Sequence, residues 1–195
     1  MSTDKPNILL IQADQLAACA LPCYGNPVVQ SPNIDALAED GVIFESAYCN
    51  NPICAPSRFS MLSGQHTSSI HAFDNGAEFS ADIPTVAHYL RESGYQTCLA
   101  GKMHFVGADQ LHGFESRVTT DVYPSDHGWT PDWSRPDERV DWWYHNMDSV
   151  IEAGPCERTN QIDFDDAVAF NAQRQIYDIA RSEDQRPFFL TVSFT

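Results

Sequence analysis

The alternation of short apolar strands with amphipathic helices is the feature that most restricts the fold of this 195-residue chain. Short apolar runs bounded by turn-forming residues favour buried strands, whereas apolar residues spaced three or four apart favour helices. The pattern predicts strands over 6–13, 42–48, 95–100 and 188–194, and helices over 32–40, 84–93 and 163–182. Strands that alternate with helices are typical of an α/β fold with a largely parallel sheet. Functional side chains are then expected at the carboxyl ends of the strands.

Two segments of the sequence indicate how the chain is organised into domains. Residues 104–160 are rich in Gly, Pro, Asp and Trp, and we expect long ordered loops there. The strand predicted over 188–194 reaches almost to the last residue, Thr195. A domain seldom stops at what reads as an inner strand, so residues 1–195 are expected to be the amino-terminal part of a larger domain.

The net charge of the chain argues against two classes of binding partner. Eleven Lys and Arg against twenty-seven Asp and Glu give a net charge of −16. Nucleic acids and anionic membrane surfaces require a positive footprint, so we expect neither as a partner. No apolar run approaches the roughly 20 residues of a membrane span, and no secretory signal precedes the first strand. We therefore expect a cytoplasmic protein, whose six cysteines are mostly small buried apolar residues.

Three short motifs and one isolated carboxylate carry the chemistry. Residues 54–58 read Cys-Ala-Pro-Ser-Arg, residues 62–64 read Leu-Ser-Gly, and residues 101–104 read Gly-Lys-Met-His. Asp14 directly follows the first predicted strand. This set, in this order, resembles the type I sulfatases of the alkaline phosphatase superfamily along essentially the whole chain. The resemblance implies their α/β sandwich, with a mostly parallel central sheet flanked by helices, and makes the chain the amino-terminal part of a sulfatase catalytic domain.

The resemblance also implies roles for five residues. Cys54 would be oxidised by a maturation enzyme to formylglycine, which serves as nucleophile and metal ligand. Asp14 would bind a hard divalent cation, with Ca²⁺ expected and Mg²⁺ or Mn²⁺ as alternatives, because carboxylate oxygens suit such ions. Arg58 would steady the hydrated aldehyde, Lys102 would contact both the sulfate and the hydrate, and His104 would donate a hydrogen bond to the hydrate.

The chemistry of a sulfate ester explains why such a nucleophile is needed. Attack on sulfur builds negative charge on the sulfate oxygens, so the site needs cations as well as an acid for the leaving alcohol. An aldehyde hydrate carries two hydroxyl groups on one carbon. One attacks sulfur, and loss of a proton from the other expels sulfate and restores the aldehyde. An unmodified Ser or Cys lacks this second step.

One departure from the pattern of many arylsulfatases points to a substrate class. Those enzymes carry two adjacent Asp residues after the first strand, whereas here Asp14 is followed by Gln15. Choline sulfatases and phosphonate monoester hydrolases carry the same Asp-Gln pair at this position. The segments at 74–78, 109–115, 119–121, 128–132 and 141–146 resemble choline sulfatases, which favours the first of these two groups.

The tryptophans support a cationic substrate. All four lie within the fifteen residues from 129 to 143. A quaternary ammonium cannot donate a hydrogen bond, and aromatic faces attract it through the ring quadrupole. By the resemblance, Trp129 and His145 line the choline end of the site and Asn75 lies near the sulfate.

The sequence therefore predicts a sulfatase that hydrolyses choline O-sulfate to choline and sulfate and that forms a homo-oligomer when full length. Two other functions stay open, namely a phosphonate monoester or phosphodiester hydrolase on the same scaffold, and an inactive fragment or binding module. Structural alternatives also stay open for single residues. Lys102 could be a surface lysine, His104 a hydrogen-bonded structural histidine, and the tryptophans anchors for a long loop.

Overall fold

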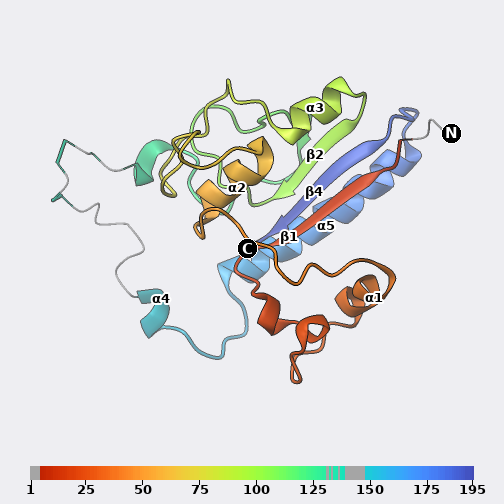
Figure 1. Cartoon of the computed structure of the whole chain (residues 1–195), viewed down its shortest axis with the longest axis horizontal. Helices are drawn as coiled ribbons and strands as arrows, with labels where there is room; N and C mark the ends of the chain where they lie inside the picture. The colour runs from red at the N-terminus through yellow and green to blue at the C-terminus, as the bar shows by residue number, and fades with distance from the viewer. Residues whose placement is uncertain (1–4, 131, 133, 136, 139–147) are drawn as a thin grey trace.

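The computed structural model of the chain describes residues 5–130, 132, 134–135, 137–138 and 148–195. Across these residues the strands form one parallel sheet in the order β1-β4-β2-β3. The strands are β1 (Ile8–Ala13), β2 (Gln96–Gly101), β3 (Ser116–Arg117) and β4 (Phe188–Phe194). β1 and β4 pair along their whole length, from Ile8 opposite Phe189 to Ala13 opposite Phe194. Their carboxyl ends therefore meet at one edge of the sheet (Figure 1).

Helices cover the two faces of this sheet. The long helix α5 (Asn160–Arg181) runs along one face, and α2 (Cys54–Ser63) and α3 (Val86–Glu92) lie on the other (Figure 1). The shorter helical elements are α1 (Pro32–Asp40), α4 (Asp148–Ile151) and the 3-10 helices η1 (Ala18–Ala20), η2 (Pro22–Tyr24) and η3 (His127–Trp129).

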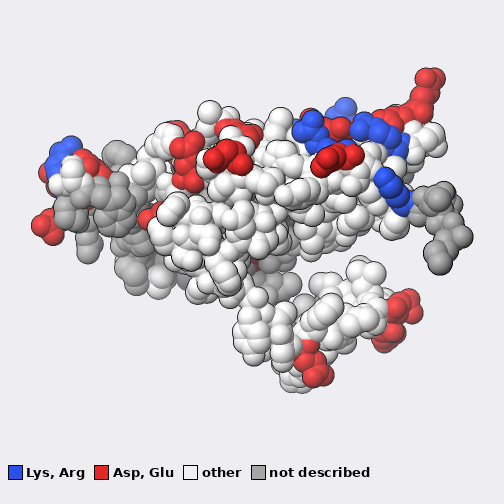
Figure 2. Space-filling view, turned by 45° about the horizontal axis from the view of Figure 1, so that its top comes forward, with Lys and Arg blue, Asp and Glu red and all other residues white. Residues whose placement is uncertain are grey.

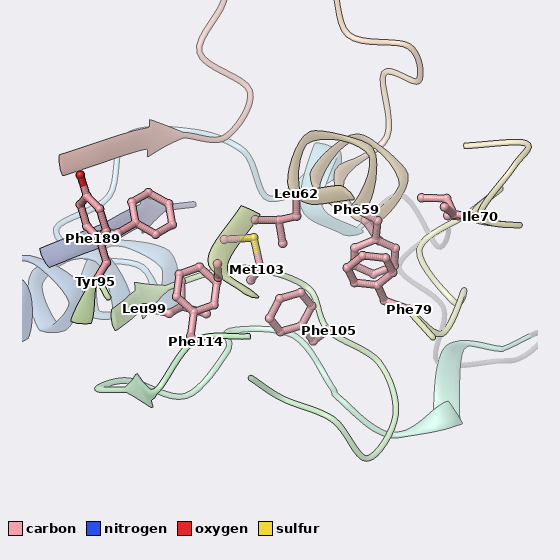
Figure 3. Packing of buried hydrophobic residues seen from close by; sticks show 13 residues of the cluster. Phe59, Leu62, Ile70, Phe79, Tyr95, Leu99, Met103, Phe105, Phe114 and Phe189 are labelled. Carbon is pink, nitrogen blue, oxygen red and sulfur yellow. The ribbon is translucent and has the colours of Figure 1, made fainter. Parts of the chain in front are cut away.

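The period-two alternation of the strands divides the core into two clusters. Leu99 of β2 and Phe189 of β4 face the cluster that contains α2 and α3. Their neighbours Cys98 and Leu190 face α5 instead. The first cluster is the larger, and aromatic rings fill much of it (Figure 3). A parallel sheet is expected to be covered in this way on both faces.

The sequence predictions for the fold are confirmed at most elements. The strand predicted over 188–194 matches β4, and the helix predicted over 163–182 matches α5, which begins three residues earlier. Thr159 explains the earlier start, because its hydroxyl accepts a hydrogen bond from the backbone N–H of Ile162 and so caps the helix.

One prediction over 42–63 is corrected, and one helix in this range was not predicted. Residues 42–48 form no strand, and their apolar side chains, such as Phe44 at 70 % exposure, lack a sheet neighbour. The motif at 54–58 begins α2, which the apolar spacing did not reveal. Pro56 is compatible with this helix because it stands in the first turn, where a backbone N–H has no helical partner.

Residues 16–48, here called the N-terminal lobe, lie apart from the sheet (Figures 1 and 2). The lobe holds η1, η2 and α1, and none of its residues is buried. A tyrosine hydroxyl links two of its loops, since Tyr24 Oη donates to the carbonyl oxygen of Phe44 at 3.1 Å. The prediction that most cysteines are buried is wrong: all six are free, and of them only Cys98 is buried.

Surface charge is locally balanced where basic residues occur. On the face shown in Figure 2 most Lys and Arg side chains stand beside Asp or Glu. Arg186, for example, pairs with Glu115 at 3.0 Å and with Asp184 at 2.8 Å. Within the described part of the chain, no helix is both long and apolar enough to cross a membrane.

Candidate active site

Asp14 stands at the carboxyl end of β1 and meets groups from two other elements. Its backbone N–H donates to the carbonyl oxygen of Phe194 at the end of β4, at 3.4 Å. Its carboxylate forms ion pairs with Arg58, at 3.4 Å, and with Lys102. Burial by itself raises the pKa of Asp14, but Lys102 and Arg58 outweigh it and hold the pKa below its ordinary value. Asp14 is therefore an ionised carboxylate at neutral pH.

Cys54 is the first residue of α2, and its thiol points toward this carboxylate. The distance from Cys54 Sγ to Asp14 Oδ2 is 3.4 Å, and Lys102 Nζ lies 3.6 Å from the same sulfur. The next backbone N–H, that of Ala55, donates to Asn75 Oδ1 at 3.0 Å. A helix amino terminus carries partial positive charge, so this end of α2 favours an anionic group beside Cys54.

Arg58 lies one helical turn after Cys54 and joins α2 to the sheet. Its side chain is 1 % exposed. One guanidinium nitrogen, Nη1, donates to Gln12 Oε1 at 3.1 Å, to Ser193 Oγ at 2.7 Å and to the carbonyl oxygen of Lys102 at 2.9 Å. Burial lowers the pKa of Arg58, whereas the charge of Asp14 opposes that effect. Because these contacts involve β1, β4 and the end of β2, Arg58 fixes three strands and α2 relative to one another.

Lys102 follows β2 through a glycine that permits a close approach. Gly101 has φ +101°, and a Cβ there would lie 1.9 Å from the carbonyl oxygen of Ser193. Only glycine fits this combination of left-handed backbone and close contact. The Lys102 side chain, also 1 % exposed, lies with its ammonium 4.5 Å from the centre of the Tyr123 ring.

His104 lies behind Lys102 among aromatic rings. The imidazole stacks on Tyr123 at 4.8 Å and meets Trp129 edge-on at 5.6 Å between ring centres. It is 1 % exposed, and within the described residues neither ring nitrogen has a hydrogen-bond partner. Burial lowers its pKa to about 4; the charge of Asp121 opposes this shift and Lys102 adds to it. His104 is therefore a neutral imidazole at physiological pH, and it lacks the partners of a hydrogen-bonded structural histidine.

A cavity of about 600 Å³ opens in front of these groups. Its wall includes Asp14, Cys54, Asn75, Tyr123 and Trp129. Residues from α2, η3, α5 and several loops, including the loop after β1, thus share one hollow at the carboxyl edge of the sheet. His145, the other residue expected at the choline end, lies outside the described residues.

Four residues of this region were not singled out by their sequence pattern. Gln12 and Ser193 hold Arg58, and Asp121 and Tyr123 lie beside His104. The polar side chains of Gln12 and Ser193 inside otherwise apolar strands were the available signal, because a buried polar residue needs a partner.

The cavity wall offers one suitable ligand for a divalent cation. The ionised carboxylate of Asp14 on the cavity wall is a hard oxygen donor of the kind that Ca²⁺ and Mg²⁺ prefer. Over the ranges that the structure describes, no group of three or more His, Cys, Asp or Glu side chains is placed to hold a metal ion. Asp14 thus fits a hard cation as one member of a larger ligand set.

Comparison with known proteins decides the family. The sulfatase family model matches residues 6–195, nearly the whole chain. The chain belongs to the sulfatase family. It is 52 % identical over 198 residues to a choline-sulfatase of Rhizobium meliloti (strain 1021), covering 100 % of this chain and 39 % of that protein. It is also 36 % identical over 118 residues to the iduronate 2-sulfatase of Homo sapiens, covering 59 % and 21 %.

Solved structures support the predicted sulfatase fold. The phosphonate monoester hydrolase of Agrobacterium radiobacter aligns with a TM-score of 0.66 and 25 % identity, over 97 % of this chain and 40 % of that one. A protein in complex with D-glucosamine-2-N,6-O-disulfate aligns with a TM-score of 0.68 and 22 % identity, over 97 % and 34 %. The expected α/β fold is confirmed. The chain spans about two fifths or less of the proteins named here.

Proposed function

We propose that the protein hydrolyses choline O-sulfate to choline and sulfate. The observation that carries the proposal is one cavity whose wall holds two kinds of group. Asp14 and Cys54, with Lys102 in contact with both, provide a charged reaction centre. Trp129 provides an aromatic surface on the same cavity wall. The 52 % identity to a choline-sulfatase over the whole chain supports the same substrate.

Lys102 and Arg58 have different roles in the proposed hydrolysis. The reaction adds water across the ester, so that sulfate is released and the choline oxygen gains a proton. Lys102 Nζ lies 3.6 Å from Cys54 Sγ, so it can hold an oxygen of the sulfate that reacts there. Arg58 is engaged by Gln12, Ser193 and Asp14, and so it holds the nucleophile's helix and the carboxylate in register rather than binding substrate.

Two groups would complete the centre. Formylglycine, formed from Cys54 by a maturation enzyme, would supply a hydrated aldehyde as nucleophile. A divalent cation, with Ca²⁺ expected and Mg²⁺ or Mn²⁺ as alternatives, would be held by Asp14 and position 54 and would stabilise negative charge on the sulfate. The lowered pKa of Asp14 keeps its carboxylate ionised for this purpose.

A phosphonate monoester or phosphodiester hydrolase is the second candidate. The structural similarity to such a hydrolase, with a TM-score of 0.66, favours it, as does the Asp14-Gln15 pair. The aromatic wall distinguishes the two candidates, because an aryl phosphodiester has no quaternary ammonium group to occupy it.

The test compares three substrates with protein made from the complete reading frame. We expect kcat/KM for choline O-sulfate to exceed that for its uncharged isostere, 3,3-dimethylbutyl sulfate, by about tenfold, the value of one favourable cation–π contact. Trp129→Leu should remove most of this preference, and Trp129→Phe should keep part of it. An aryl phosphodiester as the best substrate, or equal turnover of the two sulfates, would contradict the proposal.

Position 54 has its own test. Cys54→Ala should abolish turnover while the protein stays folded, and peptide mass spectrometry of the parent should find formylglycine at residue 54. Cys156→Ala is the matched control, because Cys156 is exposed and takes no part in the cavity wall. Full activity of Cys54→Ala would refute the mechanism.

A further inference from the structure

The loop that carries Lys102 and His104 has an unusual backbone. His104 has φ +63°, a left-handed conformation that is unfavourable for residues other than glycine. Met103 and His104 are both buried, so their backbone N–H groups are shielded from water. Buried N–H groups require acceptors, so this loop depends on a group outside it.

Asp121 supplies that acceptor. Its Oδ2 accepts hydrogen bonds from the N–H groups of Met103, at 2.9 Å, and His104, at 2.7 Å. Arg117 Nη2 donates to the same oxygen at 2.8 Å. The side chain of Asp121 is 4 % exposed. The carboxylate is therefore a buried charge that is paired with Arg117, and its Oδ2 holds the loop after β2.

The other carboxylate oxygen of Asp121 holds a second segment. Oδ1 accepts from the N–H groups of Val122, at 2.9 Å, and Tyr123, at 3.4 Å. Tyr123 is the residue whose ring lies 4.5 Å from Lys102 Nζ and stacks on His104 at 4.8 Å. One carboxylate thus fixes both partners of this stack through their backbones.

We propose that Asp121 is a positioning residue, which sets Lys102 and His104 against Tyr123 and so aims the Lys102 ammonium at position 54. The proposal deepens the function proposed above and rests on it for the effect on turnover. The side chain of Asp121 accepts hydrogen bonds from backbone N–H groups and from Arg117, so it acts on the cavity through the backbone of the two segments.

The charge state of Asp121 agrees with this role. Burial raises the pKa of its carboxyl, but the N–H groups of Met103 and His104 and the charge of Arg117 outweigh burial and leave the pKa below its ordinary value. Arg117 is itself tied to the loop, because its Nη2 also donates to the carbonyl oxygen of Gly101 at 3.3 Å. An ionised acceptor makes stronger hydrogen bonds than a neutral one, which suits a group that holds strained backbone.

The test is Asp121→Asn in protein made from the complete reading frame, with two independent measurements. In protein labelled with ¹³C-histidine, the ring signal of His104 should carry a ring-current shift from Tyr123 and Trp129, and the substitution should reduce that shift. With choline O-sulfate, kcat should fall by at least about tenfold with a smaller change in KM, because misplacing a reacting group by about 1 Å can cost about 10²-fold.

Asp109→Asn is the matched control. The Asp109 carboxylate also accepts two backbone N–H groups, those of Leu111 at 2.9 Å and His112 at 3.0 Å, but it holds a loop outside the cavity wall. We expect this variant to keep both the His104 signal and kcat. A role of Asp121 in overall stability alone would lower the melting temperature and leave both measurements of the folded protein unchanged.

Asp121→Glu keeps the proposal testable should Asp121→Asn fail to fold. This variant retains the charge beside Arg117 but moves the carboxylate by the length of one methylene group. We therefore expect a smaller loss of the His104 ring-current shift and a smaller fall in kcat than in Asp121→Asn. An unchanged His104 signal or an unchanged kcat in a folded Asp121 variant would overturn the proposal. The NMR measurement needs no substrate, so it separates failure of this inference from failure of the choline sulfate assignment.

Discussion

The N-terminal lobe and the region of α2 and β2 contain similar apolar side chains but bury them very differently. In the lobe, Leu37 is 69 % exposed and Phe44 is 70 % exposed. In α2 and β2, Phe59 and Leu99 are both 0 % exposed. α1 and α2 both carry apolar residues three positions apart, Ile34 and Leu37 in α1 and Phe59 and Leu62 in α2, so this spacing does not determine burial. What differs is that the strands present an apolar surface to α2, whereas among the described residues no such surface covers the lobe.

The difference in burial between the two regions also bears on function. The groups around Cys54 are held by contacts among α2, β1, β2 and β4, and these contacts are buried. In the part of the chain that the structure describes, the lobe contributes no side chain to these contacts. We therefore expect changes at the sheet edge to affect stability and catalysis together, and changes in the lobe to affect neither by much.

The largest expected contrast is between Phe59→Ala and Phe44→Ala. Phe59 stacks on Phe79 with ring centres 4.6 Å apart, in the cluster shown in Figure 3. Truncating a buried Phe costs about 3–5 kcal/mol, whereas an exposed substitution changes stability by about 0.5 kcal/mol or less. Urea unfolding of both variants measures this difference. A loss above about 1 kcal/mol for Phe44→Ala would show that the lobe is covered in the intact protein.

The second contrast concerns pH. His104 is buried with a pKa of about 4, below its ordinary value of 6.5, so below pH 6.5 the unfolded chain binds a proton that the native state does not. Its contribution to stability is complete above pH 6.5 and is lost as the pH falls toward 4, by about 3 kcal/mol. His104→Gln should flatten this part of the stability profile. The exposed residue His66 provides the control, since His66→Gln should leave the profile of the parent unchanged.

The smallest contrast separates backbone strain from steric contact. Gly25 in the lobe and Gly101 at the site have φ of +96° and +101°, but an added Cβ meets nothing within 4 Å at Gly25. Gly25→Ala should cost about 1–2 kcal/mol for the left-handed backbone alone. Gly101→Ala should cost about 1–3 kcal/mol more, because the Cβ collides with the backbone of Ser193. Equal melting temperatures of the two variants would show that the backbone of β4 moves to accommodate the added Cβ at residue 101.

The sequence by itself determined the elements with a clear local period and the family. β1, β2, β4 and α5 were predicted because strand and helix periodicity depends on near neighbours in the chain. The motif at 54–58, with Asp14 and Lys102, identified the sulfatase family because few chains carry those residues in that order. Their roles in catalysis stay predictions.

Only the tertiary structure decided which side chains are buried and which residues join the site. Arg58 meets Ser193 across 135 positions of sequence, and Asp121 reaches the N–H of His104 from 17 positions away. The exposed segment at 42–48 has the composition of a strand, yet it forms none because no neighbouring strand pairs with it. Local patterns describe what a segment prefers, but pairing, burial and close approach depend on contacts between segments that the chain brings together only when it folds.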